Sequence, residues 1–106
     1  MFYLNDMPNV LLDSKRSFVV FSYDHGHGLM LLRSRKTPDN PTRMDVLFQD
    51  VRAIESRMWF EGIRIEESDL QAIAEFQSNP CELIEPGLRV YLLRGSNWSG
   101  YVLAGC

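Results

Sequence analysis

Two histidines lie two residues apart in the segment DHGHG, residues 24–28. In an extended strand, His25 and His27 would project from the same face about 7 Å apart. Imidazoles at this separation can share a metal ion, and Asp24 could add an oxygen ligand or orient one ring. The chain has no other histidine and the next glutamate is Glu55, so a metal site would need a third ligand from distant acids or a cysteine.

The same segment also has the composition of a hairpin turn. Gly26 and Gly28 permit the backbone conformations that tight turns require. Asp24 can accept hydrogen bonds from the amides that follow it. We favour this interpretation, in which both imidazoles are exposed at the tip of the hairpin. A metal or small-molecule site formed by Asp24, His25 and His27 is the alternative, and no cofactor is predicted.

Alternation of apolar and polar side chains predicts β-strands over most of the chain. The predicted strands span 16–24, 29–36, 43–54, 60–68, 88–95 and 98–105, and one or two short strands are expected within 2–5 and 9–13. Within 43–54 the apolar parity changes near Gln49 and Asp50, which indicates a bulge or a bend.

The periodicity becomes helical at residues 68–77, where Ser68 begins a capping-box pattern. Leu70, Ile73, Ala74 and Gln77 would then fall on one side of this helix. The sequence therefore predicts one domain over 1–106 with an α+β fold that is mainly antiparallel β. We expect about seven strands in a sandwich or half-barrel, with one short α-helix near 68–77.

The net charge of −3 is unevenly distributed along the chain. Within 13–43, six basic residues stand against three acidic ones, whereas within 44–86 ten acidic residues stand against three arginines. A net negative charge disfavours a general nucleic-acid binder, because phosphate contacts need positive charge. The basic residues that could still make a nucleic-acid contact are Arg33, Arg35, Lys36 and Arg43.

No targeting or membrane segment is evident in the sequence. No stretch approaches the roughly 18 apolar residues that span a bilayer. The N-terminus lacks the basic start and apolar block of a signal peptide. Cys81 and Cys106 have neither the number nor the spacing of a disulfide framework or a zinc site. We therefore expect a cytoplasmic protein that does not contact membranes.

Catalytic motifs are missing from the sequence, but several aromatic residues could form a recognition surface. Neither a G-x-S-x-G nucleophile motif nor a glycine-rich phosphate-binding loop occurs. We therefore expect a protein without catalytic activity. The candidate recognition residues are Trp59, Phe60, Trp98 and Tyr101. Packing within the sheet is the alternative role for these side chains, and one of the adjacent pair Trp59 and Phe60 should face the core.

The stretch TRMDVLFQDVRAIESRMWFEGIRIEES, taken with HGLMLLRS, resembles small uncharacterised bacterial β-rich proteins, some of which are of the immunity-protein type. The resemblance covers residues 25–68 and contains no diagnostic residue, so no functional position carries over. It implies a small, acidic, cytoplasmic protein that acts by binding.

These observations together predict a protein-interaction module. Its partner would be another protein, as for an immunity-type inhibitor, or a second copy of the chain in a homodimer, because the edges of a β-sheet pair readily with one another. The alternative function is small-molecule or metal binding, with weak enzymatic activity included, at the 24–28 loop.

Overall fold

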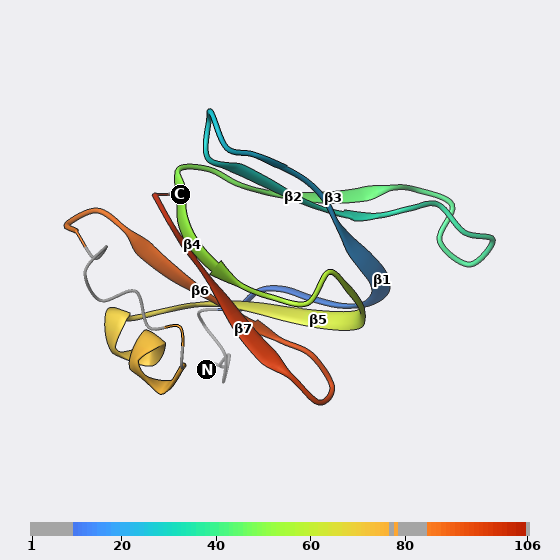
Figure 1. The fold of residues 1–106 in the computed structure, drawn as a ribbon. Coiled ribbons are helices and arrows are strands. Elements are labelled where there is room, and N and C mark those ends of the chain that lie inside the picture. Colours follow the sequence, from blue (N-terminus) through green and yellow to red (C-terminus); the bar gives the residue numbers. More distant parts are fainter. Residues whose placement is uncertain (1–9, 77, 79–84, 106) are drawn as a thin grey trace, which may run out of the picture.

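A computed structural model describes residues 10–76, 78 and 85–105 and shows a strongly curved antiparallel sheet (Figure 1). Its strands are β1 (Val10–Asp24), β2 (Leu29–Ser34), β3 (Met44–Phe48), β4 (Val51–Glu55), β5 (Trp59–Ser68), β6 (Arg89–Arg94) and β7 (Ser99–Ala104). Their order in the sheet is β3-β2-β1-β5-β6-β7-β4. The predicted antiparallel β-rich fold is confirmed as a half-barrel, and the strand expected at 2–5 lies outside the described residues.

The curvature of the sheet arises largely from β1, which pairs with β5 along its first part and with β2 along its last part. Between Ser14 and Ser17, two residues of β1 lie opposite the single residue Gly62 of β5, so the strand is bulged there. Gly62 has a φ of 76°, a conformation that glycine adopts without strain. A second bulge at Phe21 bends β1 again where it pairs with β2.

The two ends of the sheet are joined by a sharp corner at Gln49 and Asp50. The predicted strand over 43–54 is divided there into β3 and β4, which form opposite edges of the sheet. Asp50 has a φ of 52°, and the amide of Gly105 donates to the carbonyl oxygens of both corner residues at 3.2 and 3.0 Å. The amide of Val51 donates to the carbonyl of Gly28 at 2.9 Å. These bonds close one end of the half-barrel.

The core lies on both faces of β6 and β7, which explains their nearly continuous apolar sequence. Inside the half-barrel, side chains of β6 and β7 such as Leu93 and Val102 pack with Phe18 and Phe60. On the outer face, Tyr101 and other side chains of these strands are covered by the short helical segment. Ile63 and Ile65 of β5 also face the inside of the half-barrel and are only 3% and 2% exposed.

The helical segment is a 3-10 helix, η1 (Leu70–Glu75), in place of the predicted α-helix over 68–77. Its N-cap is Asp69, one residue after the predicted Ser68, and the Asp69 carboxylate accepts from the amide of Gln71 at 3.0 Å. Three residues per turn place Ile73 and Phe76 on one side, against β6 and β7.

Of the four residues predicted to share one side of the helix, Ile73 is buried, whereas Leu70 and Ala74 are exposed and Gln77 lies outside the described residues. Within the ranges described above, no helix is long and apolar enough to cross a membrane.

Candidate functional site

The DHGHG segment is the turn that connects β1 to β2. The carboxylate of Asp24 accepts from the amide of Gly26 at 2.9 Å, as expected for a turn stabilised by an aspartate. Its other oxygen lies 2.8 Å from Nδ1 of His27. The hydrogen bond with His27 is the main cause of a lowered pKa at Asp24. The side chain of His27 is 76% exposed, so this pair lies at the surface and not inside a cavity.

Metal titration should distinguish this turn from a metal site. Among the residues with described positions, no three His, Cys, Asp or Glu side chains are grouped to hold a metal ion. Calorimetric titration of Zn²⁺ should therefore give the same heats for the wild type and for the His25→Ala/His27→Ala double variant. A saturable heat that disappears in the double variant would show that the turn does bind metal.

The four candidate recognition aromatics occupy different environments. Trp59 is 59% exposed on the outer face of β5, whereas Phe60 is 3% exposed and Tyr101 is 1% exposed. Trp98 is half-buried, with its ring centroid 5.1 Å from that of Phe60. The structure therefore places Phe60 and Tyr101 in the core and does not bring the four rings together on one surface. As predicted, one of the adjacent pair Trp59 and Phe60 faces inward.

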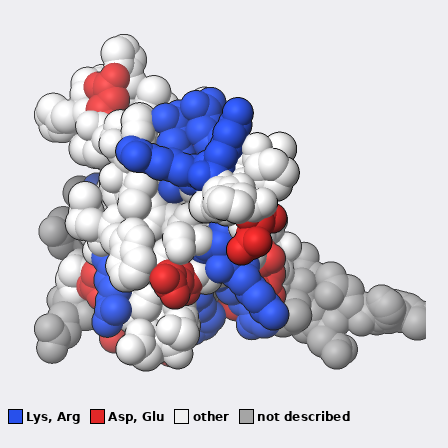
Figure 2. Space-filling model, turned by 90° about the vertical axis from the view of Figure 1, so that its right-hand side faces the viewer, with Lys and Arg blue, Asp and Glu red and all other residues white. Residues whose placement is uncertain are grey.

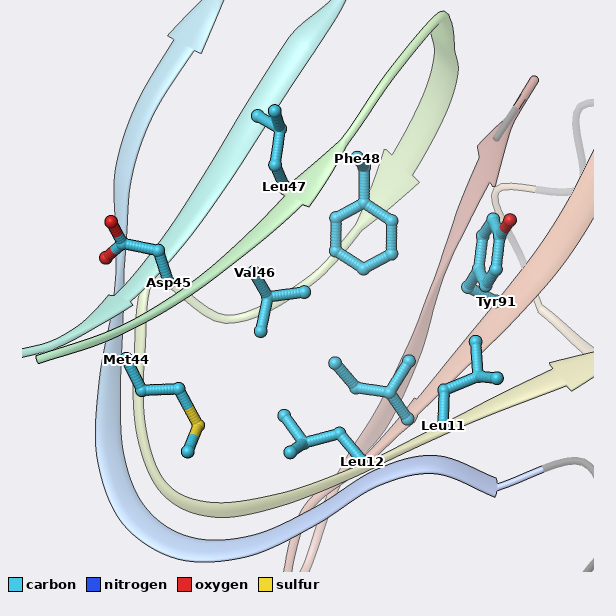
Figure 3. A pocket seen from close by; sticks show the side chains of 9 residues that line it. Leu11, Leu12, Met44, Asp45, Val46, Leu47, Phe48 and Tyr91 are labelled. Atoms are coloured by element: carbon cyan, nitrogen blue, oxygen red, sulfur yellow. The ribbon is translucent and has the colours of Figure 1, made fainter.

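An apolar pocket of about 430 Å³ opens between β3 and the inner face of the sheet (Figure 3). Met44, Val46 and Phe48 point from β3 into this pocket, towards Leu12 of β1 and Tyr91 of β6. The complete lining is Leu11, Leu12, Met44, Asp45, Val46, Leu47, Phe48, Ile65 and Tyr91. The volume and the apolar lining are those of typical ligand-binding pockets in proteins.

The pocket is closed at one end and open along β3. At the closed end, next to the corner, the rings of Phe48 and Tyr91 pack with centroids 5.4 Å apart. Further along β3, Val46 and Met44 are only partly buried. Leu11, which lines the pocket from β1, is 58% exposed. Large apolar side chains thus remain in contact with water at the open side, where burial by a partner would be favourable.

The open side is also an unpaired sheet edge. Every residue of β3 from Met44 to Phe48 pairs with β2, and no other described strand pairs with β3. Natural edge strands are commonly protected by charges, prolines or bulges. β3 contains no proline and one charge, and this carboxylate of Asp45 is neutralised by Arg33 at 2.9 Å and Arg43 at 3.4 Å. The strand therefore carries little protection against pairing with another strand.

Acid titration should reveal the ion pairs of Asp45. Hydrogen bonding from Arg33, followed by the charges of Arg33 and Arg43, lowers the pKa of Asp45. A lowered folded-state pKa means that the stabilisation is fully present above the unfolded value of about 3.9 and is lost as the pH falls through the folded-state pKa. In urea denaturation, Asp45→Asn should be less stable than the wild type at neutral pH, and the difference should shrink as the solution is acidified below about pH 4.

A control for this titration is Asp39→Asn, because Asp39 makes no ion pair with any residue in the described ranges. An Asp45→Asn difference that stays constant from neutral to acid pH would contradict the assignment.

The pocket residues were not identified as a site in the sequence. Met44, Val46 and Phe48 share one face of β3, but the same alternation occurs in any half-buried strand. Leu12, Ile65 and Tyr91 join them only through the curvature of the sheet. An apolar strand with a single charged residue next to a chain reversal is the one sequence signal that could have indicated an unprotected edge.

The site and fold define a seven-stranded antiparallel half-barrel with an apolar pocket behind an open strand edge. The chain matches no family model, no curated protein and no solved structure.

Proposed function

We propose that the protein is a non-catalytic protein-interaction module that binds an extended segment of a partner protein along β3. The unpaired edge of β3 directly above an apolar pocket is the observation that supports this proposal. In strand addition, main-chain hydrogen bonds provide affinity and pockets for alternate side chains provide specificity. Both elements are present on the open side of the half-barrel.

The partner segment would have apolar side chains at every second position. A strand beside β3 would lie about 4.8 Å from it, over the mouth of the pocket. Its inward side chains would contact Leu12, Val46 and Ile65, and its backbone would pair with the edge of β3. Inhibition of a toxin in the manner of an immunity protein is one form of this function, and it remains a prediction.

Selection from a library of random linear peptides tests this proposal. We expect the enriched peptides to alternate apolar and polar residues and to lose binding when Val46 is replaced by glutamate. Enriched peptides without this alternation, or peptides that bind the Val46→Glu variant equally well, would contradict strand addition. Failure to enrich any peptide would count against it as well.

A second copy of the chain is the other occupant that β3 could accept, since two such edges can pair about a two-fold axis. Light scattering across a range of protein concentrations separates the two cases. A dimer that dissociates when a selected peptide is added would show self-pairing through β3. A monomer at high concentration would exclude the homodimer and leave the partner segment as the proposal.

A further inference from the structure

A second pocket, of about 410 Å³, lies next to the bulge of β1 and the end of β2 and collects basic side chains from separate strands. Lys15 and Arg16 come from the bulge of β1, and Arg33 and Arg35 come from the end of β2. Figure 2 shows lysine and arginine side chains gathered on this side of the molecule. Asp39 is the one carboxylate among the residues that line the pocket.

Two of these cations form no ion pair with a described residue, and the other two are oriented by hydrogen bonds. Lys15 and Arg35 are exposed and form no ion pair with any residue whose position is described. Arg16 donates from Nε to Ser34 at 3.0 Å and from its terminal nitrogen to the carbonyl of Thr42. Because hydroxyl and carbonyl oxygens are neutral acceptors, Arg16 retains its full positive charge at the pocket.

An exposed aromatic ring completes the pocket. Trp59 lines it and is 59% exposed, although its neighbour Phe60 lies in the core. Residue pairing across the strands places Trp59 beside Val19, and Val19 beside Arg33, in one row on the outer face. The Nε of Arg33 donates to Asp45 at 2.9 Å, and its guanidinium lies 3.9 Å from the ring centroid of Phe21, so it forms a fixed wall of the site.

We propose that this pocket binds single-stranded nucleic acid. Sequence-tolerant binding of single strands combines cations that contact phosphates with aromatic rings on which bases stack. Lys15, Arg16 and Arg35 would contact the backbone, and Trp59 would stack on a base. The overall charge of −3 disfavours general polyanion binding, but the bulge and the end of β2 concentrate positive charge locally. An acidic peptide would use the cations without needing the exposed indole ring.

Anisotropy of a fluorescently labelled oligothymidylate, measured with the full chain at low ionic strength, tests this proposal. Lys15→Glu/Arg35→Glu should weaken binding by at least about tenfold, and Trp59→Ala should weaken it by about tenfold. Three phosphate contacts predict a slope of about −2 for the logarithm of affinity against the logarithm of salt concentration. The control Arg89→Glu/Arg94→Glu makes the same change in net charge at exposed sites on β6 outside the pocket, where the two arginines pair with Glu67 and Glu66, and should retain most of the affinity.

Several results would overturn the proposal. Equal losses of affinity in the two charge-reversal variants would indicate that binding depends on the net charge of the protein and not on this pocket. Unchanged affinity after Trp59→Ala would exclude base stacking, and equal competition by polyglutamate would indicate an acidic protein surface as the ligand. Absence of oligonucleotide binding at low ionic strength would also contradict the proposal. Circular dichroism of each variant confirms that a loss of binding is not a loss of fold.

Discussion

Replacing Phe60 by alanine is expected to lower the free energy of unfolding by about 3–5 kcal/mol. Phe60 is 3% exposed and pairs directly with Phe18 across β1 and β5. Its ring centroid lies 6.2 Å from that of Phe18 and 5.1 Å from that of Trp98. The substitution would leave a cavity where the inner faces of two strands meet. Because small domains have a total stability of about 5–15 kcal/mol, this loss should be plain in urea denaturation.

Trp59→Ala is the matched control for this prediction, because it removes a larger side chain from the next position of the same strand. Trp59 is 59% exposed, so its removal should change the stability by less than about 0.5 kcal/mol. If Trp59→Ala destabilises the protein as much as Phe60→Ala does, the assignment of inward and outward faces on β5 is wrong.

Val46→Glu should weaken the binding of a selected peptide by about a hundredfold, which corresponds to about 2.7 kcal/mol. In the free protein, the partly buried Val46 adjoins the open side of the pocket, where a glutamate can remain hydrated. A strand added to β3 would cover that carboxylate with apolar side chains and leave it without a partner. Burial of an uncompensated charge costs several kcal/mol, so the peptide would lose most of its affinity.

Leu47→Glu places the same charge one residue further along β3; Leu47 borders the pocket, but its side chain points to the opposite side of the strand from Val46 (Figure 3). Leu47 is 51% exposed, and a glutamate there would stay in water with or without the peptide. Its effect on affinity should be less than about fivefold, the size expected of an exposed charge. Equal losses for Val46→Glu and Leu47→Glu would place the peptide outside the pocket. Fluorescence polarisation of the labelled peptide measures both variants.

The fold was largely predictable because local signals agreed along the chain. Alternating apolar residues predicted the positions of the strands in the described sheet, and the glycines of 24–28 predicted the first hairpin. Two differences remain: 43–54 is two strands, and the separate strands predicted at 9–13 and 16–24 are parts of the single strand β1. The break near Gln49 and Asp50 was visible as a change of parity. What parity could not show is that the two resulting strands lie at opposite ends of the sheet, because that arrangement depends on the curvature of β1.

The type of the helix depends on tertiary packing that the local pattern does not contain. Residues 70–75 have α-helical spacing in the sequence, but Ile73 and Phe76 must both reach the outer face of β6 and β7. A 3-10 helix aligns residues three apart, and this short segment adopts it. The prediction from the capping box located the helix correctly to within a residue or two and gave the wrong helix type.

The candidate sites were less predictable than the fold. The residue types of the 24–28 loop suggested a metal site as an alternative to a turn. The structure shows both histidines on an exposed turn. The apolar pocket is formed by residues that are individually ordinary, such as Leu12, Val46 and Ile65. They form a candidate binding site only because no described strand pairs with the outer edge of β3. The sequence of a strand does not show whether another strand pairs with its edge.

Amide hydrogen exchange of β3, measured with and without a selected peptide, tests whether a strand adds to this edge. In the free protein, the amides of β3 that point away from β2 should exchange rapidly. These amides should exchange at least about tenfold more slowly when the peptide is bound, because each would gain a main-chain hydrogen bond. Amides of β6, which is flanked by β5 and β7, should not change. A bound peptide that leaves the exchange of every β3 amide unaltered would contradict strand addition at this edge.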